Sequence, residues 1–190
     1  MQSPKPRSSD PKSDPSWPPK PSFPPLADNE ARQKLFGPFN FVADPQPNNK
    51  EHIRILGDWI EKNIVKREIP QLKSVKGAPK EVAFHRKGID ALIAIWNEWE
   101  KAKLLDRILS WDGSFVPRFV RGSTTSLSNH AFGTAFDINA QWNPMGSRPA
   151  LIGEKGCTRE LVAIAHEHGF YWGGHFTRQD GMHFEVAVVK

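Results

Sequence analysis

Cysteine is nearly absent from this sequence, and that scarcity restricts the chemistry of any metal site. The 190 residues contain one cysteine, Cys157, so the chain cannot form an internal disulfide. A zinc site built from cysteines is excluded for the same reason, and a metal would need histidine and carboxylate ligands. The helical zinc signature HExxH is also missing. We regard Cys157 as a bystander.

Long apolar runs and long basic runs are missing too. No stretch approaches the roughly 18 apolar residues of a transmembrane helix, and the N-terminus lacks the apolar stretch of about 7–15 residues that a secretory signal needs. No stripe of Lys and Arg is interleaved with aromatic residues. We therefore expect a soluble monomer that binds neither nucleic acid nor membrane and carries no conventional export signal.

The composition is that of a globular protein with a basic surface. Hydrophobic residues make up 38% and charged residues 25% of the chain, which suits one domain with its own core. The formal net charge is +5, which favours an anionic partner such as a cell-wall polymer, although it also serves solubility alone.

The N-terminal part differs in amino-acid composition from the rest of the chain. Nine of the seventeen prolines lie in residues 1–27, mixed with Ser, Lys and Asp, and such a composition buries little apolar surface. We expect 1–27 to be a disordered or polyproline-II tail, in which Trp17 and Phe23 act as part of a spacer or as docking residues. The folded domain then spans 28–190.

Apolar spacing predicts short helices and strands in mixed order. The expected helices cover 53–65, 88–105 and 158–169, the last with Thr158 as N-cap and Gly169 at its end. The expected strands cover 81–86, 114–121, 134–139 and 183–189. In the helix 88–105, Trp96 and Trp99 are assigned to the core. The fold class is α+β: one domain with a small, mainly antiparallel sheet packed by helices.

The segment 126–144 places an acidic residue between core positions. If 134–139 is a strand, Phe136 and Ile138 face the core, while Asp137 faces the other side. Gly133 permits a close approach of the backbone, so His130 can fold back towards Asp137.

The segment 169–187 supplies a second histidine. Asp180 and Gly181 indicate a turn, after which His183 and Glu185 share one face of the last strand. Two histidines and one aspartate would leave a fourth position open, which is the layout of a catalytic zinc site on the sheet. A lone strand histidine is more often structural, however, and other histidines compete as ligands on spacing alone: His52, His85, His166, His168 and His175.

Two motifs resemble a known family. They are S-x-H-x-x-G-x-A-x-D, at 128–137, and D-x-x-H-F-E, at 180–185. This pair is similar to the zinc D-alanyl-D-alanine carboxypeptidase and L-alanyl-D-glutamate endopeptidase family, which includes VanY, VanX and several phage endolysins. The likeness extends over about residues 30–190. It implies a hedgehog-like fold.

The resemblance also implies roles for individual residues. One zinc ion would be held by His130, Asp137 and His183, with Asp180 as general base and then acid. Glu185 would orient a ligand, and Ser128 belongs to the first motif.

An arginine ahead of the first motif would steady the carbonyl oxygen. Residues three apart face opposite sides of a regular strand, so only one of Arg118 and Arg121 should enter the site, and Arg118 is favoured. Trp172 and His175 are candidates for lining the substrate cleft. The alternative for Trp172 is a place in the core.

The implied substrates are stem peptides of bacterial peptidoglycan. The base position holds Asp180, where D-Ala-D-Ala carboxypeptidases usually carry Glu, so the resemblance slightly favours L-Ala-D-Glu endopeptidase activity. The alternative is a catalytically inactive zinc module that binds cell wall or protein. Without a signal, the protein would be made in the cytoplasm and would reach the wall after lysis or by specialised delivery.

Overall fold

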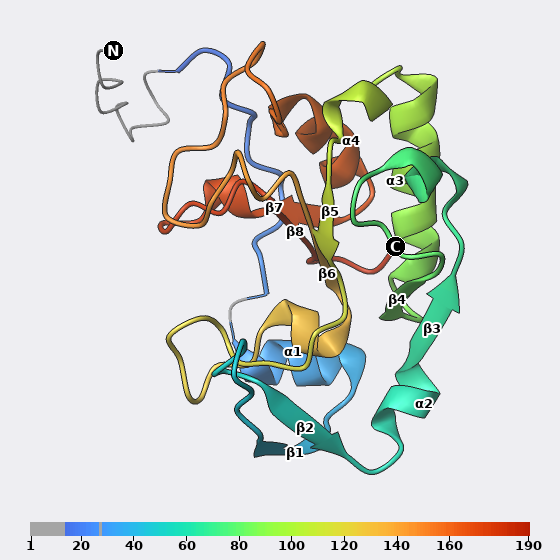
Figure 1. Ribbon diagram of the computed structural model, residues 1–190, viewed down its shortest axis with the longest axis vertical. Helices are drawn as coiled ribbons and strands as arrows, with labels where there is room; N and C mark the ends of the chain where they lie inside the picture. The colour runs from blue at the N-terminus through green and yellow to red at the C-terminus, as the bar shows by residue number, and fades with distance from the viewer. Residues whose placement is uncertain (1–13, 27) are drawn as a thin grey trace.

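A four-stranded antiparallel sheet lies at the centre of the domain. The computed structural model describes residues 14–26 and 28–190, and the sheet has the strand order β5-β6-β8-β7 (Figure 1). Its strands are β5 (Trp111–Gly113), β6 (Ala135–Ile138), β7 (Phe170–Trp172) and β8 (His183–Val186). The predicted strands at 134–139 and at 183–189 are therefore confirmed, the second with an earlier end.

Register places the two predicted segments side by side. Asp137 of β6 lies directly opposite His183 of β8, and Phe136 lies opposite Phe184. Because side chains alternate along a strand, Phe136 and Phe184 share one face of the sheet and Asp137 and His183 share the other. One face thus supplies core, and the other supplies polar groups.

Helix α3 (Ile89–Lys101) covers the apolar face. Trp96 and Trp99 are fully buried, as predicted, and Trp99 packs edge-on against Phe136 and Phe184. Phe136 stacks almost parallel with both Trp111 and Phe184, at ring separations of 5.6 and 5.3 Å. Aromatic pairs of this kind contribute roughly 0.5–1.5 kcal/mol each beyond their buried area. This cluster fixes β6 and β8 against each other.

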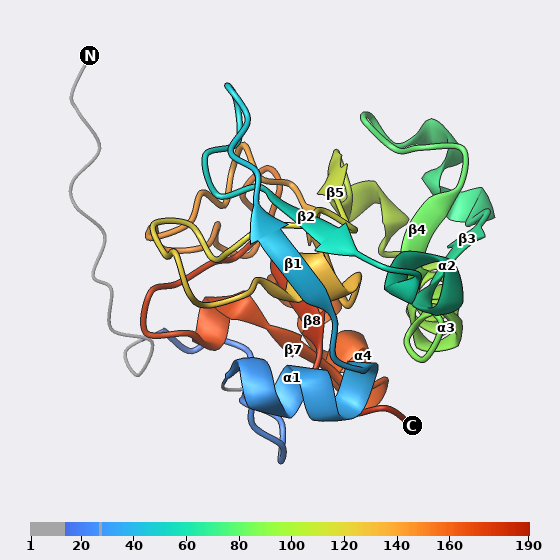
Figure 2. The same ribbon diagram turned by 90° about the horizontal axis from the view of Figure 1, so that it is seen from below.

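Smaller elements surround this centre. Two antiparallel pairs, β1 (Asn40–Ala43) with β2 (Ile53–Leu56) and β3 (Ile64–Arg67) with β4 (Val82–His85), lie beside it. The domain also contains three further α-helices: α1 (Asn29–Phe36), α2 (Trp59–Asn63) and α4 (Val162–Glu167). The described residues include five short 3-10 helices as well, and two of them contribute to the site or border α4: η4 (Asn129–Phe132) and η5 (Arg159–Leu161). Figure 2 shows α2, α3, β3 and β4 grouped on one side, with α1 on the other. The α+β class is confirmed; among the described residues, no helix is long and apolar enough to cross a membrane.

Three predicted elements differ from the structure. Residues 53–65 form β2, α2 and the start of β3, because Gly57 turns the chain with a positive φ of 77° and the β-branched residues Ile53, Ile55 and Ile64 favour strands. The segment 114–121 forms isolated bridges rather than a regular strand. Thr158 is the N-cap residue of the 3-10 helix η5, which precedes α4, but its side chain makes no capping hydrogen bond, because its hydroxyl donates to the Gly181 carbonyl.

The N-terminal segment also differs from the expected tail. Residues 1–13 lie outside the described residues, but 14–26 run along the domain to α1 (Figure 1). Asp14 forms ion pairs with Arg148 and with Arg159, and these partners hold the pKa of Asp14 well below its usual range. Trp17 lies against Trp172, and the Arg159 guanidinium lies over the ring of Trp17. The proline-rich composition predicted a disordered or polyproline-II tail and gave no sign of these interactions with the domain.

Candidate metal site and catalytic cleft

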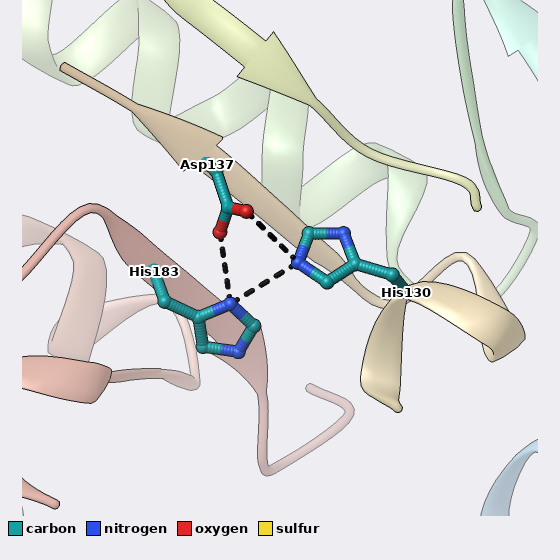
Figure 3. A group of neighbouring side chains, drawn as sticks. All are labelled: His130, Asp137 and His183. Atoms are coloured by element: carbon teal, nitrogen blue, oxygen red, sulfur yellow. Dashed lines mark hydrogen bonds and ion pairs between the residues drawn. The ribbon is translucent and has the colours of Figure 1, made fainter. Parts of the chain in front are cut away.

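Three side chains converge on the polar face of the sheet. Asp137 comes from β6, His183 from β8, and His130 from the 3-10 helix η4 that precedes β6 (Figure 3). The Asp137 carboxylate lies 2.9 Å from His183 Nδ1 and 3.2 Å from His130 Nε2, and these two nitrogens are 3.2 Å apart. Within residues 14–26 and 28–190, these three form the one group with potential metal-ligand atoms all within 4.8 Å of one another.

Gly133 allows His130 to reach this position. It ends η4 in the left-handed conformation, with φ of 64°, and its amide donates to the His130 carbonyl. A Cβ atom there would lie 2.7 Å from Ile64 Cδ1 and 3.2 Å from the His85 amide nitrogen. A side chain would therefore be both strained and crowded. The predicted close approach at Gly133 is confirmed.

The outer nitrogens of both histidines have acceptor partners. His130 Nδ1 lies 2.6 Å from the Ser114 carbonyl oxygen, and His183 Nε2 lies 3.0 Å from Glu185 Oε2. A carbonyl and a carboxylate can only accept, so in the neutral imidazoles these nitrogens carry the protons. His130 Nε2 and His183 Nδ1 then present lone pairs to the Asp137 carboxylate.

Three lone-pair donors facing one point need a cation between them. Burial alone lowers the pKa of His183, but hydrogen bonds with Asp137 and Glu185 outweigh burial and raise it to about 10. For Asp137, burial opposes ionisation, but the neighbouring His130 and His183 outweigh it and hold the pKa below its usual range. A divalent metal meets the same demand with two imidazoles and one carboxylate, which is a zinc-type ligand set.

The other candidate histidines lie elsewhere. His52 hydrogen-bonds the Asp44 carbonyl, and His85 is buried against the Phe36 carbonyl, where burial lowers its pKa to about 4. His166 and His175 stack on each other with ring centroids 5.4 Å apart. His168 follows the end of α4. The alternatives left open by spacing are thus separated by the fold.

Asp180, in the loop before β8, lines the same cleft as His183 of the triad. Its side-chain oxygen Oδ1 is buried and has no hydrogen-bond partner within the described part of the chain. Burial raises the pKa of Asp180 above its usual value, and the charge of Asp137 adds to this effect, while His183, His130 and Arg118 oppose it. A buried carboxylate with an unused oxygen is costly for a purely structural group and is a frequent property of a catalytic acid or base.

The cleft has a volume of about 360 Å³ and mixed chemistry. Leu26, Val120, Met145 and Phe176 supply apolar walls, while Arg118 and Arg178 supply positive charge. The remaining lining residues are Pro25, Arg32, Arg121, Ser128, Asn129, Asp180, His183 and Glu185. The cleft thus combines apolar walls with positive charge and with the acids Asp180 and Glu185.

The two candidate arginines have different surroundings. Arg118 is half-buried; burial lowers the pKa of its guanidinium, while Asp137 and then Asp180 draw the pKa up. Arg121, at the exposed rim, donates from Nη1 to Glu51 Oε2 at 2.7 Å and to Asn49 Oδ1 at 2.8 Å. Arg118 is therefore the arginine whose charge acts on the cleft acids.

Trp172 and His175 lie beneath the site rather than in the cleft wall. Trp172 is fully buried and donates to the Gly181 carbonyl at 2.9 Å, so it belongs to the core and supports the turn before His183. His175 is buried and lies 3.3 Å from the indole nitrogen of Trp17 through its Nδ1. Ser128 lies at the cleft, where its hydroxyl accepts from the His130 amide. Sequence patterns missed Arg32, Asn129 and Ser114, whose contacts become visible only in the fold.

Residues 121–186 match the family model described as D-alanyl-D-alanine carboxypeptidase. The match covers about a third of the chain and includes the triad, Asp180 and Glu185, whereas Arg118 precedes it. Over this part of its length the chain is similar to that peptidase family. No curated protein and no solved structure gave a significant match.

The triad makes a direct prediction for metal content. We expect the purified wild-type protein to hold about one divalent metal ion per chain, and His130→Ala and His183→Ala each to lose nearly all of it, because each removes one of three ligands. Elemental analysis after removal of loosely bound metal measures this. His168→Ala is the matched control and retains the metal; loss of metal in His168→Ala but not in His183→Ala would contradict the assignment.

Proposed function

We propose that this protein is a zinc peptidase that hydrolyses amide bonds in the stem peptides of bacterial peptidoglycan. The observation that carries the proposal is that His183, a member of the His130, Asp137 and His183 cluster, lines one cleft with Asp180, whose carboxylate oxygen Oδ1 is buried and unpartnered. The family match over 121–186 supports the reaction class. A zinc ion at the triad would supply a Lewis acid and would lower the pKa of bound water.

Asp180 acts in this proposal as general base and then general acid. Its unpartnered Oδ1 accepts a proton from the attacking water, and its raised pKa suits the return of that proton to the departing amine. The proton thus moves from water to the carboxylate and then to the leaving nitrogen, while the peptide carbonyl carbon gains the hydroxyl group.

Arg118 acts on the carbonyl oxygen. Its half-buried guanidinium carries its charge near Asp137 and Asp180 at the cleft, where solvent weakens it less than at the open surface. As the carbonyl carbon becomes tetrahedral, negative charge grows on the oxygen, and the guanidinium stabilises that charge more than it stabilises the ground state.

The bond that we favour lies between L-Ala and D-Glu. The shorter Asp180 stands where carboxypeptidases of this kind usually carry Glu, and the cleft offers both apolar walls and Arg178 for a peptide that carries carboxylates. The competing function from another class is an inactive zinc module that binds wall or protein. An ionisable acid left without a partner at the cleft favours the enzyme.

Substitution of Asp180 separates enzyme from binding module. We expect Asp180→Asn to retain metal but to lose about 10²–10⁴-fold in turnover, because the amide cannot accept the proton. The measurement is mass spectrometry of peptides released from purified peptidoglycan, in which new L-Ala carboxyl ends indicate endopeptidase and loss of terminal D-Ala alone indicates carboxypeptidase. Asp90→Asn, on the exposed side of α3, is the control with normal activity. Full hydrolysis by Asp180→Asn would refute the assigned role.

The two arginines give a second comparison. Arg118→Ala should lower kcat about 10²–10³-fold, because it removes a preorganised positive charge from the developing oxyanion. Arg121→Ala, which breaks only the rim contacts with Glu51 and Asn49, should change kcat less than about threefold, as exposed ion pairs contribute little. Steady-state kinetics on a defined stem peptide measure both, and the opposite order would assign the role to Arg121.

A further inference from the structure

A buried chain of hydrogen bonds joins helix α1 to the metal ligand His183. Arg32 Nε of α1 donates to Asn129 Oδ1 at 3.0 Å, and Asn129 Nδ2 donates to Glu185 Oε2 at 2.5 Å. The same Glu185 oxygen lies 3.0 Å from His183 Nε2. Two side chains, Asn129 and Glu185, thus connect the guanidinium of α1 to the imidazole at the candidate metal site through three hydrogen bonds.

The chemistry of the two ends fixes the direction of every bond between them. A guanidinium can only donate and an ionised carboxylate can only accept. The Asn129 amide between them must therefore turn its oxygen to Arg32 and its NH₂ group to Glu185. This orientation leaves Glu185 as an acceptor for His183 Nε2–H, so that His183 Nδ1 keeps a free lone pair for the metal.

Burial makes this chain costly to leave incomplete. The exposed fractions of Glu185, Asn129 and Arg32 are 3%, 4% and 8%. A buried carboxylate needs compensating donors or charge, and Arg32 is the cation placed at the far end of its chain. Burial lowers the pKa of Arg32, while Glu185 draws it up, so the two charges interact.

Arg32 has a second anchor outside the site. Its Nη2 donates to the Leu26 carbonyl at 2.9 Å, and Leu26 forms part of the cleft wall. Two donors held in one planar group fix the guanidinium in position, which a lysine ammonium could not reproduce. The N-terminal segment therefore helps to hold Arg32, the first residue of the hydrogen-bonded chain.

We propose that Arg32 is a positioning residue for the metal site, acting through Asn129 to hold Glu185 in the orientation that directs His183 Nδ1 to the metal. The inference rests on the proposed function, since it assumes that zinc binds at the triad. Arg32 precedes the family match at 121–186 and is contributed by a helix about a hundred residues earlier in the chain.

Zinc affinity in the absence of substrate tests this role. We expect Arg32→Met to raise the zinc dissociation constant about 10–100-fold, as loss of partners beyond the ligands typically does. Competition with a chromophoric chelator measures the constant. Arg67→Met, an exposed arginine on β3, is the matched surface control, and Val82→Ala, in the core at β4, controls for general loss of stability. Both should bind zinc as the wild type does.

A double-mutant cycle separates positioning from a general structural effect. If Arg32 acts through Glu185, Arg32→Met should weaken zinc binding much less in a Glu185→Gln background than in the wild type. Independent, multiplicative effects would overturn the inference. Asn129→Ala breaks the same chain in its middle and replaces Arg32→Met if that variant does not fold, with the same expected loss and the same contradicting result.

The outcomes also distinguish this inference from the proposed function. A wild-type protein that binds no zinc would overturn both. A wild type that binds zinc, together with folded Arg32→Met and Asn129→Ala variants of unchanged affinity, would overturn the positioning role alone.

Discussion

The meeting of three lone-pair donors on one face of a sheet is the constraint on which the rest of the site depends. His130 donates its outer N–H to the Ser114 carbonyl, and His183 donates its outer N–H to the Glu185 carboxylate. The other ring nitrogen of each histidine therefore points towards Asp137. Hydrogen bonds with Asp137 and Glu185 raise the pKa of His183, because three lone-pair donors that face one point favour a positive charge there. The same geometry suits a divalent metal.

The fold serves this constraint from both sides of the sheet. On one face, the stacked rings of Trp111, Phe136 and Phe184 lock β6 against β8, and this register places Asp137 opposite His183. On the other face, η4 and α1 bring a histidine, an amide and an arginine to the same strands. A rigid apolar layer thus positions a polar layer that could not hold its own geometry in water.

Local patterns predicted the parts of the site that lie on strands. Alternation in 134–139 and 183–189 identified the faces of Asp137 and His183, and Gly133 indicated the return of His130. Periodicity misjudged 53–65, since the same apolar spacing suits a strand, a turn at Gly57 and a short helix. It also could not find Arg32 or the anchoring of Asp14, because their partners lie 97 to 145 residues away and leave no local pattern.

The central claim is that zinc occupies the triad with a defined ligand set. X-ray absorption at the zinc edge, on protein loaded with one equivalent of zinc, tests it most directly. The account predicts a first shell of two imidazole nitrogens at about 2.0–2.1 Å and oxygens from Asp137 and solvent at about 2.0–2.2 Å. A sulfur ligand, a single imidazole, or a first shell unchanged in His183→Ala would contradict it.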